Sequence, residues 1–271
     1  MFTYAEHNGV GYYYSTLLKS RHAFATRKGG VSEGYTKGLN LAHGRGDDEA
    51  TVLQNLQLLA NAVGFDARRV ISLPQIHGTQ VLTVIEADAG RGYDKPADGA
   101  SDGYMTTESD LPLGVKSADC VPILLEARDA HGNVPAVSAV HAGWRGTAGG
   151  IVVNAVHALR DACGDCEIFA AIGPCIGHCC FEVEADCVGE FERLCGKETV
   201  DVCFAKAQNG KYYGNLVKVN RMLLGSAGVD DAHIDAANLC TCCHPDRFFS
   251  HRYATKYHAG QRGTMLSVIW K

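Results

Sequence analysis

The sequence lacks any apolar run of the roughly 18 residues that a membrane-spanning helix needs, so we expect no membrane partner. Its first residues lack the charged and then apolar order of a secretory signal peptide, which predicts a cytoplasmic protein. Excess positive charge is also absent: the net charge is −5, which argues against a nucleic-acid partner. With no linker, repeat or low-complexity segment, residues 1–271 are predicted to form a single domain of mixed helices and strands.

Cysteine, in contrast, is abundant. The 12 cysteines are irregularly spaced in a long chain without an export signal, which predicts that most of them are reduced thiols rather than disulfides. Two clusters, at residues 175–180 and 240–244, together with the pair at 163 and 166, hold enough ligands for a structural zinc ion. Their spacing departs from the usual paired pattern, so the sequence leaves a second metal site open.

The segment 136–150 (A-V-S-A-V-H-A-G-W-R-G-T-A-G-G) is the most informative part of the chain. An apolar run precedes His141, and apolar residues recur at helical spacing from Ile151, which indicates a strand, a glycine turn and a helix. His141 then lies at the carboxyl end of the strand, and Arg145 lies beside the free N–H groups of the helix, a natural anion site. The alternative is a structural turn with a buried histidine and Arg145 stacked on Trp144.

A second glycine-rich loop, residues 27–34, follows a predicted strand at 22–26. It is interpreted either as an anion or substrate site formed by Arg27 and backbone amides, or as a solvated turn. Residues 30–34 match the letters of the G-x-S-x-G nucleophile motif, but no helix directly follows, as that motif requires.

Periodicity and capping residues predict the remaining elements. Residues 47–49 can cap an amphipathic helix over 50–63 that ends at Gly64. Pro122 is expected to keep the start of its strand away from a fully paired central position. Further helices are expected at 151–163, 181–195 and 215–225, and strands at 11–14, 70–73, 81–85, 113–116, 121–125, 168–172 and 265–270.

His77, Cys120 and His141 are the strongest candidates for chemistry, because each falls at a predicted loop or strand end. Two imidazoles and one thiolate leave the fourth position of a zinc ion open, as in catalytic zinc sites. Asp119 and Arg145 could support such a site as proton or anion handlers. Alternatively, Cys120 could be the nucleophile and His141 the base of a cysteine hydrolase.

Several motifs resemble, in the same order, those of the laccase-domain family, also called the polyphenol oxidase family. They cover about residues 22–270, and the most specific are A-D-C-V-P at 118–122 and V-H-A-G-W-R-G-T at 140–147. The others are F-A-T-R-K-G-G-V-S at 24–32, G-L-N-L at 38–41, Q-I-H-G-T-Q-V at 75–81, I-G-P-C-I at 172–176 and C-T at 240–241.

The resemblance implies an α+β fold with mixed β-sheet layers flanked by helices. It implies that His77, Cys120 and His141 bind one zinc ion and act in catalysis, and from their positions in the sequence we expect Asp119 and Arg145 to assist them. Members of this family are described as purine nucleoside phosphorylases acting on adenosine, inosine and 5′-methylthioadenosine, with adenosine deaminase activity. We expect purine nucleosides and phosphate as partners, bound by residues Arg27, Asn40 and Arg145. Near the end the chain departs from the family pattern, which leaves the roles of Arg252 and Arg262 open.

Other functions remain possible on the sequence. The older family name suggests a multicopper oxidase, but none of the 12 histidines forms an H-x-H pair, which argues against copper. Some relatives are described as peptidoglycan-editing factors, which would suit an amidase-type hydrolase using Cys120 and His141. A non-catalytic nucleoside-binding protein is the third alternative. The sequence does not predict the oligomeric state or the preferred nucleoside.

Overall fold

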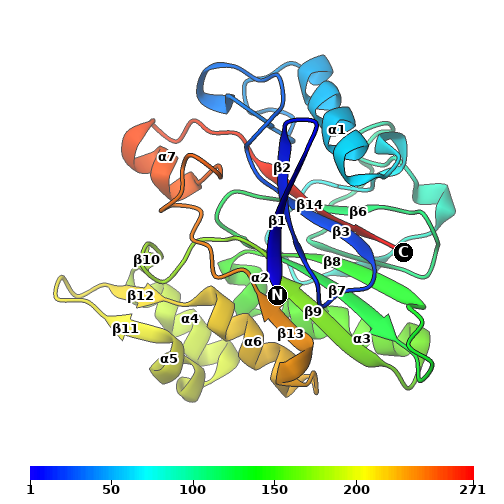
Figure 1. Cartoon of the computed structure of the whole chain (residues 1–271). Coiled ribbons are helices and arrows are strands. Elements are labelled where there is room, and N and C mark those ends of the chain that lie inside the picture. The colour runs from blue at the N-terminus through cyan, green and yellow to red at the C-terminus, as the bar shows by residue number, and fades with distance from the viewer.

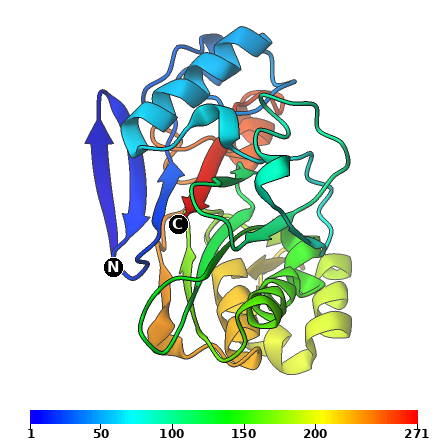
Figure 2. The same ribbon diagram turned by 90° about the vertical axis from the view of Figure 1, so that its right-hand side faces the viewer.

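Two β-sheets lie between two layers of helices in the computed structural model, which describes residues 1–271 (Figures 1 and 2). One sheet is antiparallel and has the strand order β1 (Phe2–His7), β2 (Val10–Ser15), β3 (Arg21–Ala25), β14 (Met265–Trp270) and β6 (Leu113–Ser117). The other is mixed, with the order β13 (Ile234–Ala236), β9 (Glu167–Ile172), β7 (Val121–Arg128), β8 (Ala136–Ala142), β5 (Gly103–Thr106) and β4 (Val81–Thr83). The predicted α+β class is confirmed.

Side-chain alternation along the strands explains how the layers pack. In β7, Ile123 and Leu125 point toward the helices that cover the outer face of the six-stranded sheet, whereas Leu124 points into the core between the sheets. In β14, Val268 packs toward the opposite helical layer and Ile269 toward the core between the sheets. Each central strand is buried on both faces, which accounts for its nearly continuous apolar sequence.

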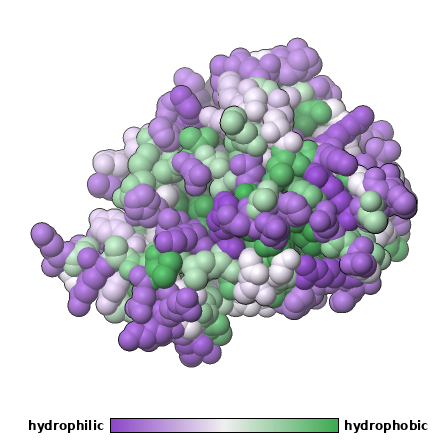
Figure 3. Space-filling model, turned by 60° about the horizontal axis from the view of Figure 1, so that its bottom comes forward, coloured by the Kyte–Doolittle hydropathy of each residue, from purple (hydrophilic) through white to green (hydrophobic).

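Helix α1 (Glu49–Val63) covers the five-stranded sheet, as Figure 2 shows at the top of the molecule. Its observed ends agree with the prediction: the Asp48 side chain accepts a hydrogen bond from the Thr51 N–H at 2.7 Å, and Gly64 closes the helix with a φ of 97°. The six-stranded sheet is covered by α3 (Ile151–Cys163), α4 (Ala185–Cys195), α5 (Lys197–Cys203) and α6 (Leu216–Ser226). The lower surface of the molecule, seen in Figure 3, carries many hydrophilic side chains with hydrophobic groups between them. No helix is both long and apolar enough to cross a membrane.

Two strand predictions are wrong. Residues 70–73 form only a single bridge, between Ile71 and Leu113, so this apolar segment is buried without a ladder. Strand β7 is central in its sheet although Pro122 is near its start. Proline is tolerated because Pro122 lies opposite Gly173, beyond the end of β9, and its carbonyl accepts the Gly173 N–H.

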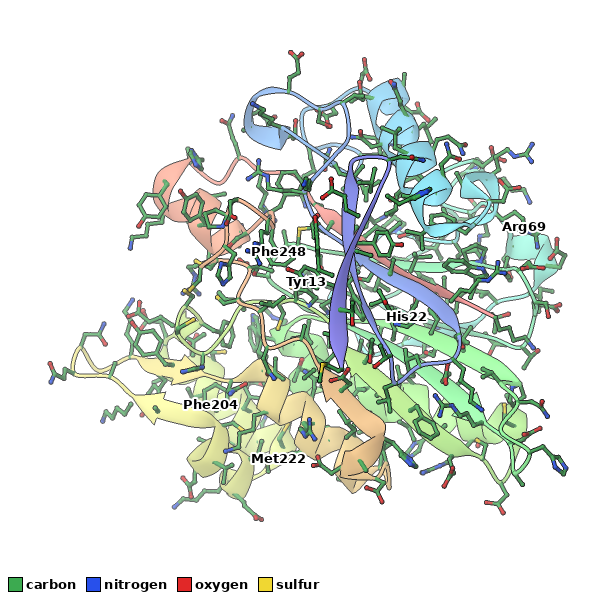
Figure 4. The ribbon with its side chains drawn as sticks, viewed as in Figure 1. Tyr13, His22, Arg69, Phe204, Met222 and Phe248 are labelled. Carbon is green, nitrogen blue, oxygen red and sulfur yellow. The ribbon has the colours of Figure 1, made fainter.

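Several short elements were not predicted. Helix α2 (Trp144–Ala148) begins directly after Gly143, where a glycine turn was expected. Phe204 and Met222 lie in the part of the molecule where a small sheet meets α6 (Figure 4). The other unpredicted elements are the strands β5 and β13, helix α7 (His251–Tyr257), the sheet of β10 (Glu182–Val183), β12 (Tyr212–Gly214) and β11 (Phe204–Lys206), and the 3-10 helices Gly34–Thr36, Ala67–Arg69, Glu86–Asp88 and Asp231–His233.

Candidate active site

The fold brings His77, Cys120 and His141 together at one end of the sheets, with one potential ligand atom from each within 4.8 Å of the others. Cys120 lies in the connection from β6 to β7, His141 near the end of the adjacent β8, and His77 in the loop before β4. The Cys120 Sγ lies 3.8 Å from the His77 Nε2, and the two imidazole rings are 5.0 Å apart in an edge-on arrangement.

A buried carboxylate, Asp102, holds both histidines in place. Its Oδ1 lies 2.8 Å from the His141 Nδ1, which leaves the Nε2 of that ring for the site. The same carboxylate accepts the backbone N–H groups of Ile76, His77 and Gly78 at 2.8 to 3.0 Å. Carboxylates that bind the second nitrogen of a metal-ligating histidine fix its tautomer and orientation. Asp102 was not predicted as a site residue because it lies in a polar, glycine-rich stretch that resembles an ordinary turn.

Backbone geometry also shapes the site. His77 has a φ of 60°, in the left-handed region that non-glycine residues seldom adopt. The hydrogen bonds from three consecutive backbone N–H groups of this loop to Asp102 offset the strain. Gly143 provides the space: a Cβ atom there would lie 2.5 Å from the His77 Cδ2 and 3.4 Å from the Cys120 Sγ. Glycine is required at position 143 because any side chain would collide with the histidine.

The electrostatics of the site favour a thiolate at Cys120. Burial alone would raise the pKa of the Cys120 thiol, but the charge of His141 and hydrogen bonds from both histidines outweigh burial and lower this pKa to about 6. Burial would likewise lower the pKa of His141, yet Cys120 and Asp102 raise it to about 9. The thiolate is the form of cysteine that binds metals and acts as a nucleophile.

Asp119 adjoins Cys120 in the sequence, and both oxygens of its carboxylate are hydrogen-bonded to other segments. Its Oδ1 accepts the Thr241 hydroxyl at 2.6 Å, and its Oδ2 accepts the backbone N–H of Arg252 at 2.6 Å. The residue is buried and has a φ of 95°. These contacts favour a positioning role, in which Asp119 anchors the turn that carries Cys120.

A cavity of 510 Å³ opens beside the three candidate ligands and contains three cationic side chains, from Arg45, Lys116 and Arg262. The Arg262 Nε is buried without a hydrogen-bond partner. Burial and the neighbouring charge of Arg45 lower the pKa of Arg262, but a guanidinium remains charged at any physiological pH. Burial also lowers the pKa of Lys116, to about 8. Such converging positive charge is typical of a site for an anion such as phosphate.

The structure places the three residues expected to bind substrate outside this cavity. Arg145 is exposed, with its guanidinium 4.1 Å from the Trp144 ring, as in the structural alternative. Arg27 donates to the carbonyl groups of Pro245 and Lys37 and lines a neighbouring pocket that shares Arg262. Asn40 is fully buried: its amide donates to Asp47, and its carbonyl oxygen accepts the Thr264 N–H. Arg45 lies far from the predicted ligands in the sequence, whereas Lys116 is close to Cys120 but was predicted only as part of a strand.

Fold and site together define an α+β protein in which two imidazoles and one thiol that could hold a metal ion lie beside a cavity lined by cationic side chains. Soft thiolate combined with imidazole suits zinc and similar ions, and the thiolate character of Cys120 fits this role.

Comparison with known proteins agrees with this class. Residues 21–271 match the family model described as "Multi-copper polyphenol oxidoreductase laccase". "Purine nucleoside phosphorylase YlmD" of Geobacillus stearothermophilus is 35% identical over 90% of this chain and 87% of its own length. "Adenosine deaminase RL5" of an unknown prokaryotic organism is 33% identical over 88% of this chain and 91% of its own length. The crystal structure of YlmD from Geobacillus stearothermophilus superimposes with a TM-score of 0.87 and 32% identity, covering 98% and 97% of the two chains.

The chain belongs to the laccase-domain, or polyphenol oxidase, family that its motifs indicated.

Proposed function

We propose that this protein is a zinc-dependent purine nucleoside phosphorylase that acts in the cytoplasm on adenosine, inosine and 5′-methylthioadenosine and also deaminates adenosine. The names of the similar proteins support both activities as family activities. The observation that carries the proposal is that an anion pocket and the His77, Cys120 and His141 group share one cavity.

Phosphorolysis requires a phosphate oxygen to attack the C1′ carbon of the nucleoside while the bond from C1′ to the purine nitrogen breaks. The purine leaves with the bonding electrons, and a ribose 1-phosphate or its methylthio analogue forms. Arg45, Lys116 and Arg262 would bind the phosphate and orient it toward the sugar, since a bound reactant attacks with a far higher effective concentration. This set replaces Arg145 and Arg27, which lie outside the cavity.

His77, Cys120 and His141 would hold the zinc ion. When bound, zinc supplies Lewis acidity, which both the departure of the purine and the addition of water to adenosine can use. Asp102 would accept the Nδ1 proton of His141 and so direct the Nε2 of this ring toward the ion. Asp119 keeps the Cys120 turn in place through Thr241 and Arg252.

A cysteine-dependent hydrolase is the second candidate, because the pKa of Cys120 falls to about 6 beside His141. The same lowered pKa would serve a nucleophile or a metal ligand. Metal analysis separates the two functions: loss of turnover on chelation and recovery with zinc support the phosphorylase. Full turnover in chelator, abolished by a thiol alkylating agent, would support the hydrolase.

The anion pocket is tested by comparing two arginine variants in the release of hypoxanthine from inosine. Arg262→Ala removes a guanidinium from the cavity, and the KM for phosphate should rise about tenfold to 100-fold, as expected for a charged hydrogen bond. Arg145→Ala is the matched control, since it removes an exposed guanidinium and should leave this KM unchanged. A larger effect for Arg145→Ala would show instead that phosphate binds at the amino-terminal end of α2.

A further inference from the structure

Four cysteines outside the active site converge on one point of the surface. Cys179 and Cys180 come from the loop after β9, and Cys240 and Cys243 come from the loop after β13, some 60 residues later. Their sulfur atoms all lie within 4.8 Å of one another. The Cys243 Sγ is 3.4 Å from the sulfurs of both Cys179 and Cys180. Cys240 and Cys243 also have the C-x-x-C spacing of a metal-binding knuckle.

The geometry resembles a tetrahedral set of thiolates. Four sulfurs bound to zinc at about 2.3 Å lie about 3.8 Å apart, close to the spacing found here. Disulfides need a sulfur separation of about 2.05 Å and would join the four cysteines in pairs. Cys243 instead is equally close to two different sulfurs, as a shared ion would require.

The backbone around the cluster leaves room for the sulfurs and supplies a hydrogen bond. The N–H of Gly177 donates to the Cys240 Sγ at 3.2 Å, a contact that stabilises a thiolate. A Cβ at position 177 would lie 3.0 Å from the Cys240 Cβ and 3.2 Å from the Cys179 Sγ. Glycine at this position therefore permits the approach of the two loops.

We propose that Cys179, Cys180, Cys240 and Cys243 bind a second divalent metal ion, zinc, in a closed four-sulfur site. All four coordination positions are filled by the protein, so the ion has a structural role and binds no substrate. Binding converts the thiols to thiolates and releases their protons to solvent, with no change in oxidation state. The partly exposed position of the cluster gives the ion access from solvent.

The second ion would crosslink the loops after β9 and β13, which support the active site. Thr241, within the C-x-x-C segment, donates to Asp119, and Asp119 adjoins Cys120. The Arg252 guanidinium donates to the carbonyl groups of Cys180 and Glu182, while its backbone N–H donates to Asp119. Metal bound at the cluster would stabilise the turn that holds Cys120 without touching the substrate.

Elemental analysis of the full-length protein, purified without chelator, provides the first test. We expect two zinc ions per chain in the native protein and one in the His77→Ala variant, which disrupts only the active-site group. X-ray absorption at the zinc edge of this variant should show sulfur neighbours only. Nitrogen neighbours, or a variant without metal, would overturn the proposal whether or not the enzyme is a phosphorylase.

The cysteine variants provide the second test. Cys243→Ser should lose one of the two zinc ions, retain the far-ultraviolet circular dichroism of a folded chain and melt at a lower temperature. Cys166→Ser is the matched control, since Cys166 lies in another C-x-x-C pair outside the four-cysteine cluster, and this variant should keep both ions. Equal metal content in all three proteins, or a disulfide between Cys179 and Cys243 found by mass spectrometry of the unreduced chain, would refute the site.

Discussion

Asp102 connects more parts of the active site than any other single side chain described here. It holds the His141 ring on one side and three backbone N–H groups of the His77 loop on the other, with only 1% of its surface exposed. The hydrogen bonds to His141 and Gly78 overcome the effect of burial and lower the pKa of Asp102. One carboxylate thus orients two of the three candidate ligands.

Asp102→Asn should weaken metal binding by about 10-fold to 100-fold, because an amide no longer fixes the His141 tautomer through a charged hydrogen bond. Titration with a competing zinc chelator measures the affinity, with the His77→Ala variant reporting the second site alone. Asp98→Asn makes the same chemical change at an exposed position of the preceding loop and should have no effect. Equal zinc affinities for the two Asn variants would show that Asp102 does not support metal binding.

Lys116 gives the cavity a pH-dependent charge. Because burial lowers the pKa of its ammonium group from 10.5 to about 8, the unfolded chain binds more protons between these pH values. The contribution of Lys116 therefore makes the folded state more stable as pH rises from about 8 to 10.5, and the full burial penalty remains below pH 8.

Lys116→Met should remove this dependence, and its stability advantage over the native protein should shrink as pH rises from 8 toward 10.5. Urea denaturation of both proteins across this range measures the difference. Phosphate affinity should also fall above pH 8 in the native protein more steeply than in the variant. Parallel stability curves for the two proteins would show that Lys116 keeps its ordinary pKa.

Among the elements, helix α1 is one whose position could be predicted from the local sequence alone. Its apolar residues repeat at helical spacing, and an acidic cap and a terminal glycine mark its ends, so its predicted and observed bounds nearly coincide. Helix α6 was predicted from its apolar residues alone, and in the structure its Asn215 cap accepts the Lys218 N–H.

Asp48→Ala should destabilise the protein by about 1 kcal/mol, because the Thr51 N–H loses its partner at the start of α1. Glu49→Ala, at the next position, removes a charge but no cap and should cost at most a few tenths of a kcal/mol. Chemical denaturation measures both changes, and an equal loss in the two variants would contradict the capping role.

Other elements depend on contacts that no local pattern contains. Residues 70–73 have a strand-like sequence, yet only Ile71 finds a bridge partner in β6, because the backbone N–H of the next residue, Ser72, donates to the carbonyl group of Arg91 instead. The short strands β10 and β11 are defined by their pairing with β12 rather than by periodicity.

The site shows the same division between local and long-range information. The sequence predicted His77, Cys120 and His141, partly from residue type and partly from resemblance to the family. Asp102 and Arg45 were not predicted because they reach the site through the packing of distant segments, and Lys116 was not predicted because no local pattern shows that its side chain lines the cavity.

For the whole molecule, the predicted single domain can be tested with the 2 tryptophans of the chain. Trp144 lies in the helical layer on the six-stranded sheet, where its ring contacts Phe191, and Trp270 lies in the layer of α1. Both sheets contribute to the core between them, so we expect the two layers to unfold together.

Trp144→Phe and Trp270→Phe each leave one tryptophan as a fluorescent reporter. In urea, the midpoint of the fluorescence transition of each variant should equal the midpoint measured by circular dichroism on the same variant. Midpoints that differ between fluorescence and circular dichroism within one variant would indicate two independently unfolding units.

Tyr13 of β2 packs on Phe248, with ring centroids 5.9 Å apart (Figure 4), so the loop with the C-x-x-C segment also rests on the five-stranded sheet. In that sheet, β14 lies between β3 and β6, and Ser267 is opposite both Phe24 and Val115. Strands from widely separated parts of the chain must meet before this sheet is complete, and such distant pairings slow folding. Refolding should consequently proceed through a slow late phase in which amide protons of β3 and β14 become protected from exchange together.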